Sequence, residues 1–385
     1  MKKWIFPVVL ILLFAFEILR VYFIMPFPGS QYANTINIAY FLSRNLWWIR
    51  LLLLSLIIWQ LYRFIRFKRF WKLGISMFFI LFYGLIAYFL NFRLSADKMF
   101  LQPEQVTFAQ GAANDVAPSK LVIGVQIKGE AKAYPIEIIG YHHQIRDVVG
   151  GKEIMVTYCT VCRTGRVFDP VVDGEMMDFR LVGMDHFNAM FEDHKTKSWW
   201  RQATGEAITG KMKGTVLAEI PSEQMPLQQW QQRYPNALVL QPDAAFKKDY
   251  AGLDGYDNGK INSDLEDRDQ NPWQPKSWVV SVEVGEHTKA FDWNELVQKK
   301  VINDTVGTTN ILLVMESDNQ TFHAFQRPAN TVYGLDATGN FISDANGVLW
   351  NMDGICVSEE GKGLKMKKLP AYQEFYHAYQ EFRKK

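Results

Sequence analysis

Two cysteines stand two residues apart in the segment V-T-Y-C-T-V-C-R-T-G, which covers residues 156–165. They are Cys159 and Cys162, and the 385-residue chain contains one other cysteine, Cys356. Thiols at this spacing can close a small disulfide ring reversibly, and a nearby cation lowers the pKa of the attacking thiol. Arg163 follows the pair directly and His143 lies before the preceding turn. These four residues, Cys159, Cys162, His143 and Arg163, are therefore the candidate catalytic site.

Metal binding is an alternative for the same residues. Cys159, Cys162 and His143 form a soft sulfur–nitrogen ligand set, which suits copper or zinc. A zinc ribbon would need a second C-x-x-C pair, which the sequence lacks. A permanent structural disulfide is the third interpretation, in a protein that binds a partner without catalysis. Thiol redox chemistry and the structural disulfide require no cofactor.

Apolar runs near the N-terminus indicate the compartment in which the cysteines lie. Residues 5–24, 46–62 and 74–91 are each about long enough to cross a bilayer. Basic residues accumulate on the cytoplasmic side of membrane proteins. Two lysines precede the first run, and five basic residues crowd the link between the second and the third: Arg63, Arg66, Lys68, Arg69 and Lys72. We therefore expect residues 1–95 to be a multi-pass membrane region with a cytoplasmic N-terminus.

The rest of the chain is then periplasmic or extracellular, anchored in the cytoplasmic (inner) membrane. Membrane lipid is one partner, and an unidentified protein or thiol compound outside the cytoplasm is the expected redox partner. The formal net charge of +2 gives no reason to expect nucleic acid. Within the apolar runs, Glu17 and Arg20 are three residues apart, so we expect them to pair on one helix face. Arg50 is a third charge in these runs, in the second of them.

The elements that position the cysteines form an α+β, strand-dominated region. From about residue 105, short apolar runs alternate with Gly, Asp and Pro, which is typical of strands joined by turns. Shifted by 157 residues, I-G-V-Q-I-K-G-E-A-K-A-Y from Ile123 aligns with V-S-V-E-V-G-E-H-T-K-A-F from Val280. We therefore predict two tandem copies of one module, at residues 119–240 and 277–385, joined by a polar linker at 241–276.

The second copy serves as an internal control for the site. Glu316 and Asn319 stand where the first copy has Cys159 and Cys162. If the cysteines only braced the module, the second copy would need a brace as well. Lysines likewise replace the two histidines at 142 and 143. The sequence thus assigns the chemistry to the first copy and a structural or surface role to the second, degenerate copy.

Several segments also resemble the bacterial domain-of-unknown-function 3179 (DUF3179) family. They are A-Y-P-I-E-I-I, H-H-Q-I-R-D-V-V-G-G-K, V-T-Y-C-T-V-C-R-T-G-R-V-F-D and F-N-A-M-F-E-D-H-K-T-K-S-W-W-R-Q-A-T-G-E-A-I-T-G. The resemblance covers most of residues 119–385. It singles out the following positions: His143, Cys159, Cys162, Asn188, Asp193, Ser198, Trp199 and Gly205.

The resemblance also bears on the chemistry of the cysteines. Some members of that family are described as selenoproteins, with selenocysteine in the C-x-x-C position, and selenium suits redox chemistry better than bracing. This sequence departs from the family pattern at Thr160 and Arg163, which replace Pro and Gly, and at Arg146, which replaces Asn. The departures alter the turn and its charge but keep both thiols. The resemblance therefore implies a redox site without naming a substrate.

Overall fold

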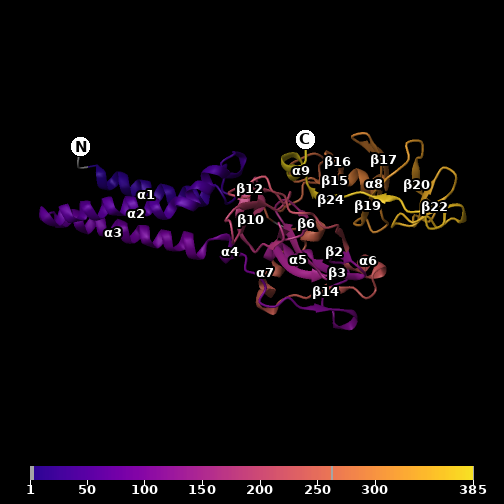
Figure 1. The fold of residues 1–385 in the computed structure, drawn as a ribbon, viewed down its shortest axis with the longest axis horizontal. Coiled ribbons are helices and arrows are strands. Elements are labelled where there is room, and N and C mark those ends of the chain that lie inside the picture. Colours follow the sequence, from indigo (N-terminus) through magenta and orange to yellow (C-terminus); the bar gives the residue numbers. More distant parts are fainter. Residues whose placement is uncertain (1–3, 262, 385) are drawn as a thin grey trace. The chain divides into compact units, whose positions relative to one another are not determined.

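The computed structural model describes residues 4–261 and 263–384. Its strands form several sheets, and together with the helices they make an α+β fold, as the sequence predicts (Figure 1). The chain divides into two compact units. Unit one comprises Met1–Leu101, Met177–Arg201 and Glu206–Val216, and unit two comprises Gln102–Met176, Gln202–Gly205 and Leu217–Lys385.

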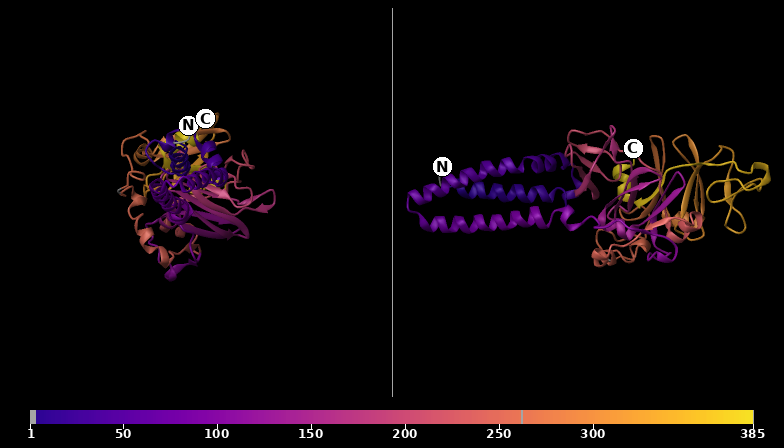
Figure 2. Two further views of the ribbon diagram at one scale, coloured as in Figure 1. Left: turned by 90° about the vertical axis from the view of Figure 1, so that its left-hand side faces the viewer. Right: turned by 60° about the horizontal axis from the view of Figure 1, so that its bottom comes forward.

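Three helices of unit one are long and apolar enough to cross a membrane. They run side by side (Figure 2), and Leu13, Ile57 and Tyr83 from the three helices share one buried apolar cluster. The helices are α1 (Ile5–Tyr22), α2 (Ile36–Arg66) and α3 (Phe70–Tyr88), and short segments accompany them: η1 (Ser30–Tyr32), the π-helical turn η2 (Phe89–Arg93) and α4 (Ala96–Met99).

Unit one also contains a four-stranded antiparallel sheet. Its strand order is β12-β11-β10-β9, with β9 (Phe179–Asp185), β10 (Asn188–Asp193), β11 (Trp199–Arg201) and β12 (Ala207–Thr209). The sequence suggested that these residues belong with the first module, but they group with the membrane helices instead. The reason is packing, because Ile24 and Ala39 share a buried cluster with Met190 and Trp199 of this sheet.

This packing also explains why α2 begins at Ile36, well before the apolar run expected from residue 46. The first turns of α2 lie against the sheet, where Tyr40 meets Trp199 edge-on with ring centroids 5.1 Å apart. Nearby, Gly183 has φ +151°, and a Cβ there would lie 2.3 Å from the Ile24 carbonyl oxygen. Only glycine fits this close approach. The helix is therefore extended by contacts outside the apolar run.

The charges in the membrane helices pair differently from the sequence expectation. The Glu17 carboxylate accepts hydrogen bonds from Arg50 Nε over 2.6 Å and from the Tyr83 hydroxyl over 2.8 Å. Arg20 instead donates to Asn91 Oδ1 over 3.0 Å. The predicted Glu17–Arg20 pair is therefore wrong. Pairing with the neighbouring helices is favoured over pairing with Arg20, because it lets the buried Glu17 carboxylate accept three hydrogen bonds, from Arg50, Tyr83 and Asn91.

Unit two begins with the strands that carry the cysteines. A five-stranded sheet has the order β1-β14-β3-β2-β13, and a three-stranded sheet has the order β4-β5-β6. Apolar side chains from both sheets meet in one core, which includes Ile123, Tyr134, Ile154 and Val167. The elements are β1 (Phe108–Ala109), η3 (Gly111–Ala113), β2 (Leu121–Ile127), β3 (Glu130–Pro135), α5 (Ile136–His142), β4 (Gln144–Val149), β5 (Lys152–Cys159), β6 (Thr164–Phe168), β7 (Val171–Val172), β8 (Glu175–Met176), β13 (Glu223–Pro226), α6 (Leu227–Arg233) and β14 (Leu238–Leu240).

The polar stretch expected to be a linker is folded onto this core. It forms η4 (Ala244–Phe246), α7 (Lys247–Ala251) and η5 (Tyr256–Asn258). Phe246, Tyr250 and Tyr256 are buried in the same cluster as Ile139 and Tyr158. Aromatic residues spaced through a polar sequence thus attach residues 241–261 to the first half of unit two.

The second half of unit two contains two three-stranded sheets and one four-stranded sheet, in the orders β16-β15-β24, β20-β21-β22 and β17-β18-β19-β23. Trp278, Val280, Ile311 and Phe375 belong to its buried core. The elements are β15 (Trp278–Val284), β16 (His287–Asp292), α8 (Trp293–Lys299), β17 (Val301–Val306), β18 (Thr309–Met315), β19 (Phe322–Gln326), β20 (Tyr333–Leu335), β21 (Ile342–Asp344), β22 (Leu349–Trp350), η6 (Glu359–Gly361), β23 (Lys367–Lys368), β24 (Ala371–Phe375) and α9 (Tyr376–Phe382).

Element order and strand register correspond between the two halves. β15, β16, α8 and β17 begin and end 157 residues after β2, β3, α5 and β4. Val122 pairs with Pro135 in the first half, and Val279 pairs with Asp292 in the second. An ion pair recurs at the same offset: Lys132 lies 2.9 Å from Asp147, and Lys289 lies 2.7 Å from Asp304.

Candidate functional site

The two cysteines flank the turn of a β-hairpin. β5 ends at Cys159, which pairs with Thr164 at the start of β6, so Cys162 lies within the turn. The N–H of Arg163 donates to the Thr160 carbonyl over 3.2 Å, and Arg163 has the left-handed backbone angle φ +54°. Both cysteine side chains are fully buried. The pair therefore closes a strand–turn–strand unit, unlike the strand-to-helix junction of a thioredoxin.

His143 is placed beside this hairpin by the end of α5. It has φ +63°, and its carbonyl accepts the N–H of Tyr158 over 3.1 Å, next to Cys159 in the chain. Its Nδ1 lies 2.9 Å from the Tyr141 carbonyl, which can only accept, so Nδ1 carries the proton and Nε2 is the basic nitrogen. Burial lowers the pKa of His143 to about 4. The imidazole is thus neutral at pH 7, and its contact with either sulfur stays a prediction.

The Arg163 side chain reaches into the second half of unit two. Its guanidinium stacks on the Trp278 ring at 3.8 Å and donates to Gln373 Oε1 over 2.9 Å. It also donates to the carbonyls of Tyr256 and Asp257. These contacts account for its complete burial. Its expected role as the cation that activates a thiol stays a prediction.

A second cation, absent from the sequence hypothesis, binds the turn itself. Lys276 Nζ donates to the carbonyl of Val161, between the two cysteines, over 2.8 Å. Burial lowers the pKa of Lys276, while the charges of Cys162, Cys159 and Glu266 oppose that shift. The ammonium group therefore lies within electrostatic reach of both sulfurs. No spacing rule identified Lys276, because it stands 114 residues beyond Cys162 in the polar stretch.

The C-terminal strand and helix hold the same turn from the second half. His377 Nε2 donates to the Val161 carbonyl over 3.0 Å, and the N–H of Phe375 donates to the Cys162 carbonyl over 2.9 Å. Burial lowers the pKa of His377 to about 4, so this imidazole is neutral at pH 7. The backbone of the C-x-x-C turn is therefore fixed by groups that the first half does not supply.

The polar stretch covers the other side of the turn. The Tyr256 hydroxyl donates to the Thr160 carbonyl over 2.8 Å, and the Thr160 hydroxyl donates to Glu266 over 2.7 Å. Tyr158 and Tyr256 bring their hydroxyls within 3.4 Å of each other, and burial raises the pKa of Tyr158 to about 12. Residues 241–261 and 263–276 thus form a cap over the turn that carries the cysteines rather than a spacer.

The family model described as "Protein of unknown function (DUF3179)" matches residues 101–385. The chain belongs to the DUF3179 family. No curated protein and no solved structure matches this DUF3179 chain. The resemblance seen in the sequence is thus confirmed for the family, whereas its selenoprotein aspect stays a prediction.

Several DUF3179 motif residues belong to unit one, whereas Cys159 and Cys162 belong to unit two. Asp193 Oδ2 accepts from the Thr196 hydroxyl, the Ser198 N–H and Trp200 Nε1 over 2.7–3.0 Å. Burial raises the pKa of Asp193, but these hydrogen bonds lower it further, so that the pKa lies below its usual value. Trp199 Nε1 donates to Glu192 over 3.0 Å. These residues shape the turn between β10 and β11.

Two further motif residues support the hairpin within unit two. Gly205 has φ +67°, and a Cβ there would lie 2.7 Å from the Phe168 ring, so only glycine fits. Gln202, which the sequence hypothesis did not single out, donates to the Thr157 hydroxyl and the Thr164 carbonyl, each over 3.0 Å. Thr157 and Thr164 lie on the two strands that carry the C-x-x-C turn. Gln202 therefore stabilises the base of the hairpin.

The copper or zinc alternative receives no support from the geometry. Across residues 4–261 and 263–384, no three His, Cys, Asp or Glu side chains gather as a group that could hold a metal ion. The Lys276 amine beside the sulfurs favours thiolates, which are both nucleophiles and metal ligands. The copper or zinc alternative therefore stays a prediction, as does the redox site.

Proposed function

We propose that this DUF3179 protein is a membrane-anchored thiol–disulfide redox protein whose C-x-x-C turn works outside the cytoplasm. The observation that carries the proposal is the Lys276 amine bound to Val161 between the two cysteines. A partly buried cation at this position stabilises a thiolate, which is the reactive form of cysteine. The neutral His143 imidazole is available to accept a proton.

The proposed reaction is exchange with a disulfide of a partner protein. One thiolate attacks a partner sulfur, which forms a mixed disulfide and releases the other partner sulfur as a thiolate. The second cysteine then attacks the mixed disulfide, closes the Cys159–Cys162 bond and releases the second partner sulfur. Two electrons pass to the partner, and the two protons lost from this chain's thiols end on the partner's thiols.

A second candidate is a scaffold protein with a fixed disulfide, and the burial of both sulfurs favours it. A partner reaches buried cysteines only if the cap moves. In the redox proposal, the cap formed by Tyr256 and Glu266 opens during exchange. The reduction potential distinguishes the two candidates, because structural disulfides lie below about −300 mV and exchanging ones lie above it.

The experiment uses the full-length protein in detergent. Thiol titration in glutathione buffers gives the reduction potential of the Cys159–Cys162 pair, and elemental analysis gives the metal content. The redox proposal expects a two-electron couple above about −300 mV that Cys159→Ser abolishes. A lower potential would favour the fixed disulfide, and stoichiometric copper or zinc lost in Cys159→Ser would favour the metal alternative.

We further propose that the N-terminus is cytoplasmic and unit two is periplasmic or extracellular. The support is the set of five basic residues where α2 ends and α3 begins, of which Lys68 and Arg69 lie between the two helices. A reporter active only outside the cytoplasm should work after Lys385 and fail near Lys68. The opposite pattern would place the cysteines in a reducing compartment and remove the basis for the redox proposal.

We also propose that the two halves of unit two are tandem copies of one module. The matching registers of β2–β3 and β15–β16 support this, as does the recurring Lys–Asp ion pair. The copies contact each other at equivalent positions, since Gln224 on β13 donates to Gln373 on β24 over 2.6 Å. In this proposal the second copy lost the cysteines but supplies the C-terminal strand and helix that hold the turn of the first.

A further inference from the structure

Unit two contains a cavity of about 470 Å³, lined by residues of both its halves. Three segments contribute most of its wall, residues 219–224, 322–324 and 368–372. Its size falls within the range of small-molecule sites. None of the four residues proposed for thiol chemistry lines it.

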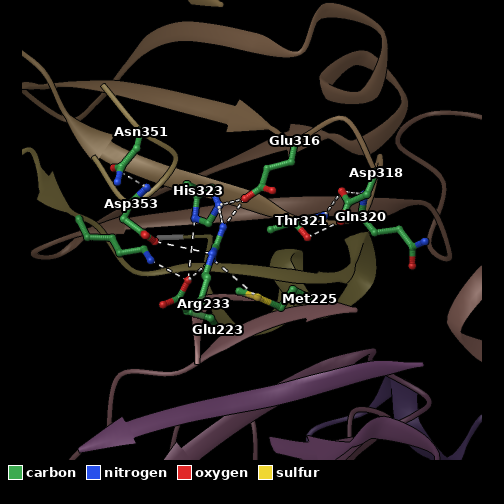
Figure 3. Close-up of polar contacts among 11 residues, drawn as sticks. Glu223, Met225, Arg233, Glu316, Asp318, Gln320, Thr321, His323, Asn351 and Asp353 are labelled. Atoms are coloured by element: carbon green, nitrogen blue, oxygen red, sulfur yellow. Dashed lines mark hydrogen bonds and ion pairs between the residues drawn. The ribbon is translucent and has the colours of Figure 1, made fainter. Parts of the chain in front are cut away.

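His323 forms part of the wall and presents an unused polar atom. Its side chain is fully buried, and Nε2 lies 2.6 Å from Glu316 Oε1 and 3.0 Å from Arg233 Nη2. Nε2 lies closer to Glu316, which can only accept, than to Arg233, which itself donates to Glu316, so we place the proton on Nε2 and the lone pair on Nδ1. Nδ1 has no hydrogen-bond partner among the residues that the structure describes, and Glu223 Oε2 lies 3.9 Å from it. Figure 3 shows Arg233 and Glu316 meeting at the His323 ring.

This arrangement makes His323 a fixed hydrogen-bond acceptor rather than a base. Burial, together with the charges of Arg233 and Lys368, lowers the pKa of His323 to about 3. At neutral pH the ring keeps its lone pair but has little affinity for a proton. A buried acceptor without a partner is costly, and a ligand that donates an N–H or O–H to Nδ1 would remove that cost.

The carboxylates around the cavity are each compensated by a cation. Glu223 lies 2.6 Å from Lys368 Nζ and 3.3 Å from Arg233. On the other side, Glu283 lies 2.8 Å from Arg383 Nη1, and Glu219 lies 3.7 Å from a buried arginine of β6. A charged ligand would leave its own charge unmatched in such a site. The charge balance therefore favours a neutral ligand.

The cavity wall also contains a hydrogen-bond donor and aromatic rings. Trp230 lines the cavity, and its Nε1 has no hydrogen-bond partner among the described residues. Its ring packs on Tyr234 with centroids 4.4 Å apart, and Tyr234 and Tyr372 also line the cavity. A hydroxyl group can both donate to His323 and accept from an indole N–H or Lys368. Aromatic faces cover the apolar faces of a compact ligand.

We propose that this cavity binds a neutral, multiply hydroxylated small molecule of about one or two sugar rings. Hydroxyl groups satisfy the unused acceptor of His323 and the unused donor of Trp230, and neutrality preserves the compensated carboxylates. The site is independent of the proposed redox chemistry, so Cys159→Ser leaves it unchanged.

The test uses the full-length protein in a detergent whose headgroup contains no sugar. Glucose, N-acetylglucosamine, maltose and cellobiose are titrated by calorimetry, with tryptophan fluorescence as a second readout. At least one of them is expected to bind at millimolar concentration or below. His323→Leu should weaken binding at least ten-fold, because a hydroxyl loses its buried acceptor.

Two further variants keep the outcome clear if His323→Leu fails to fold. Lys368→Met leaves Glu223 less compensated and should weaken binding several-fold, while Lys367→Met, its exposed neighbour on β23, should bind as the parent does. Failure of all four sugars to bind overturns the proposal. So does binding that is equal in the parent and in Lys368→Met, because the sugar then occupies another place.

Discussion

Lys276 Nζ donates a 2.8 Å hydrogen bond to the carbonyl of Val161, the residue directly before Cys162. The amine comes from just before the second half of unit two, and the carbonyl lies in the turn of the first half. A single bond thus ties a partly buried amine to the residue between the two thiols. The C-x-x-C pair therefore lies within electrostatic reach of a residue from outside the first half of unit two.

Replacing this amine should make the thiols less acidic. We expect Lys276→Met to raise the apparent pKa of the more reactive thiol by about 1 unit or more, because a nearby positive charge is lost. The measurement is the rate of alkylation of the reduced protein as a function of pH, followed by mass spectrometry. Lys299→Met is the control, since Lys299 is exposed and pairs with Glu295 on α8. Identical pH profiles for Lys276→Met and the parent would exclude the electrostatic role.

Arg163 should act on stability through its contacts with the second half. Arg163→Lys keeps the charge but loses the stacking on Trp278 and the guanidinium hydrogen bonds described above. We therefore expect a loss of about 2–4 kcal/mol in the free energy of unfolding. Arg268→Lys is a matched control, because Arg268 stacks on the same ring at 3.9 Å but is only partly buried. Denaturant unfolding followed by fluorescence should show the larger loss for Arg163→Lys. Equal losses would contradict this ranking.

Three histidines with lowered pKa values predict a stability that falls in mild acid. The pKa values of His143 and His377 are about 4, and that of His323 is about 3, all below the usual 6.5. Each unfolded imidazole binds a proton more readily than the folded one, so the stability present above pH 6.5 is lost as pH falls toward 4. Asp257 and Glu316 oppose them, because burial raises the pKa of Asp257 to about 6 and that of Glu316 above its usual value, and both carboxyls favour the folded state at lower pH.

The net expectation is a loss of a few kcal/mol between about pH 6.5 and pH 4, since three groups outweigh two. Thermal unfolding of the full chain across this range measures it. His143→Asn should flatten the dependence, because the asparagine side chain does not titrate. A midpoint that stays constant from pH 7 to pH 4 would show that these imidazoles gain water or partners on protonation.

The ion pair between membrane helices gives a fourth prediction. Glu17→Leu leaves the partly buried Arg50 without its carboxylate partner, and we expect a loss of about 3 kcal/mol or more. The double variant Glu17→Leu/Arg50→Leu should be more stable than Glu17→Leu alone, because no charge is left unpaired. Unfolding of the detergent-solubilised protein, measured as a double-mutant cycle, tests this. Additive effects of the two substitutions would rule out a direct pair.

Local patterns were enough to predict the paired elements of unit two. Alternating apolar residues indicate β2 and β15, and the 157-residue alignment gives the offset between them. Three apolar runs likewise predict the membrane helices. These features depend on neighbouring residues, whose periodicity is visible in the chain itself.

Features set by distant contacts were not predictable in this way. Lys276 reaches the turn through folding of the polar stretch, which depends on the burial of Tyr250 and Tyr256 rather than on average polarity. The extension of α2 depends on packing against Trp199. The Glu17–Arg50 pair likewise joins two helices, whereas spacing rules compare residues on one helix.

The division of the chain into units has a consequence for truncation. The backbone passes from one unit to the other after Leu101, Met176, Arg201, Gly205 and Val216. Cleaving the peptide bond after Leu101 would cut the covalent link to the membrane helices, but unit two would stay joined through the other four crossings to the β9–β12 sheet, which packs on Ile24 and Ala39. Release would therefore require this apolar contact to separate. Removing residues 1–101 would also take Ile24 and Ala39 away from the sheet that they cover. A secreted fragment that starts at Gln102 should expose the apolar face of β10 and β11 and aggregate.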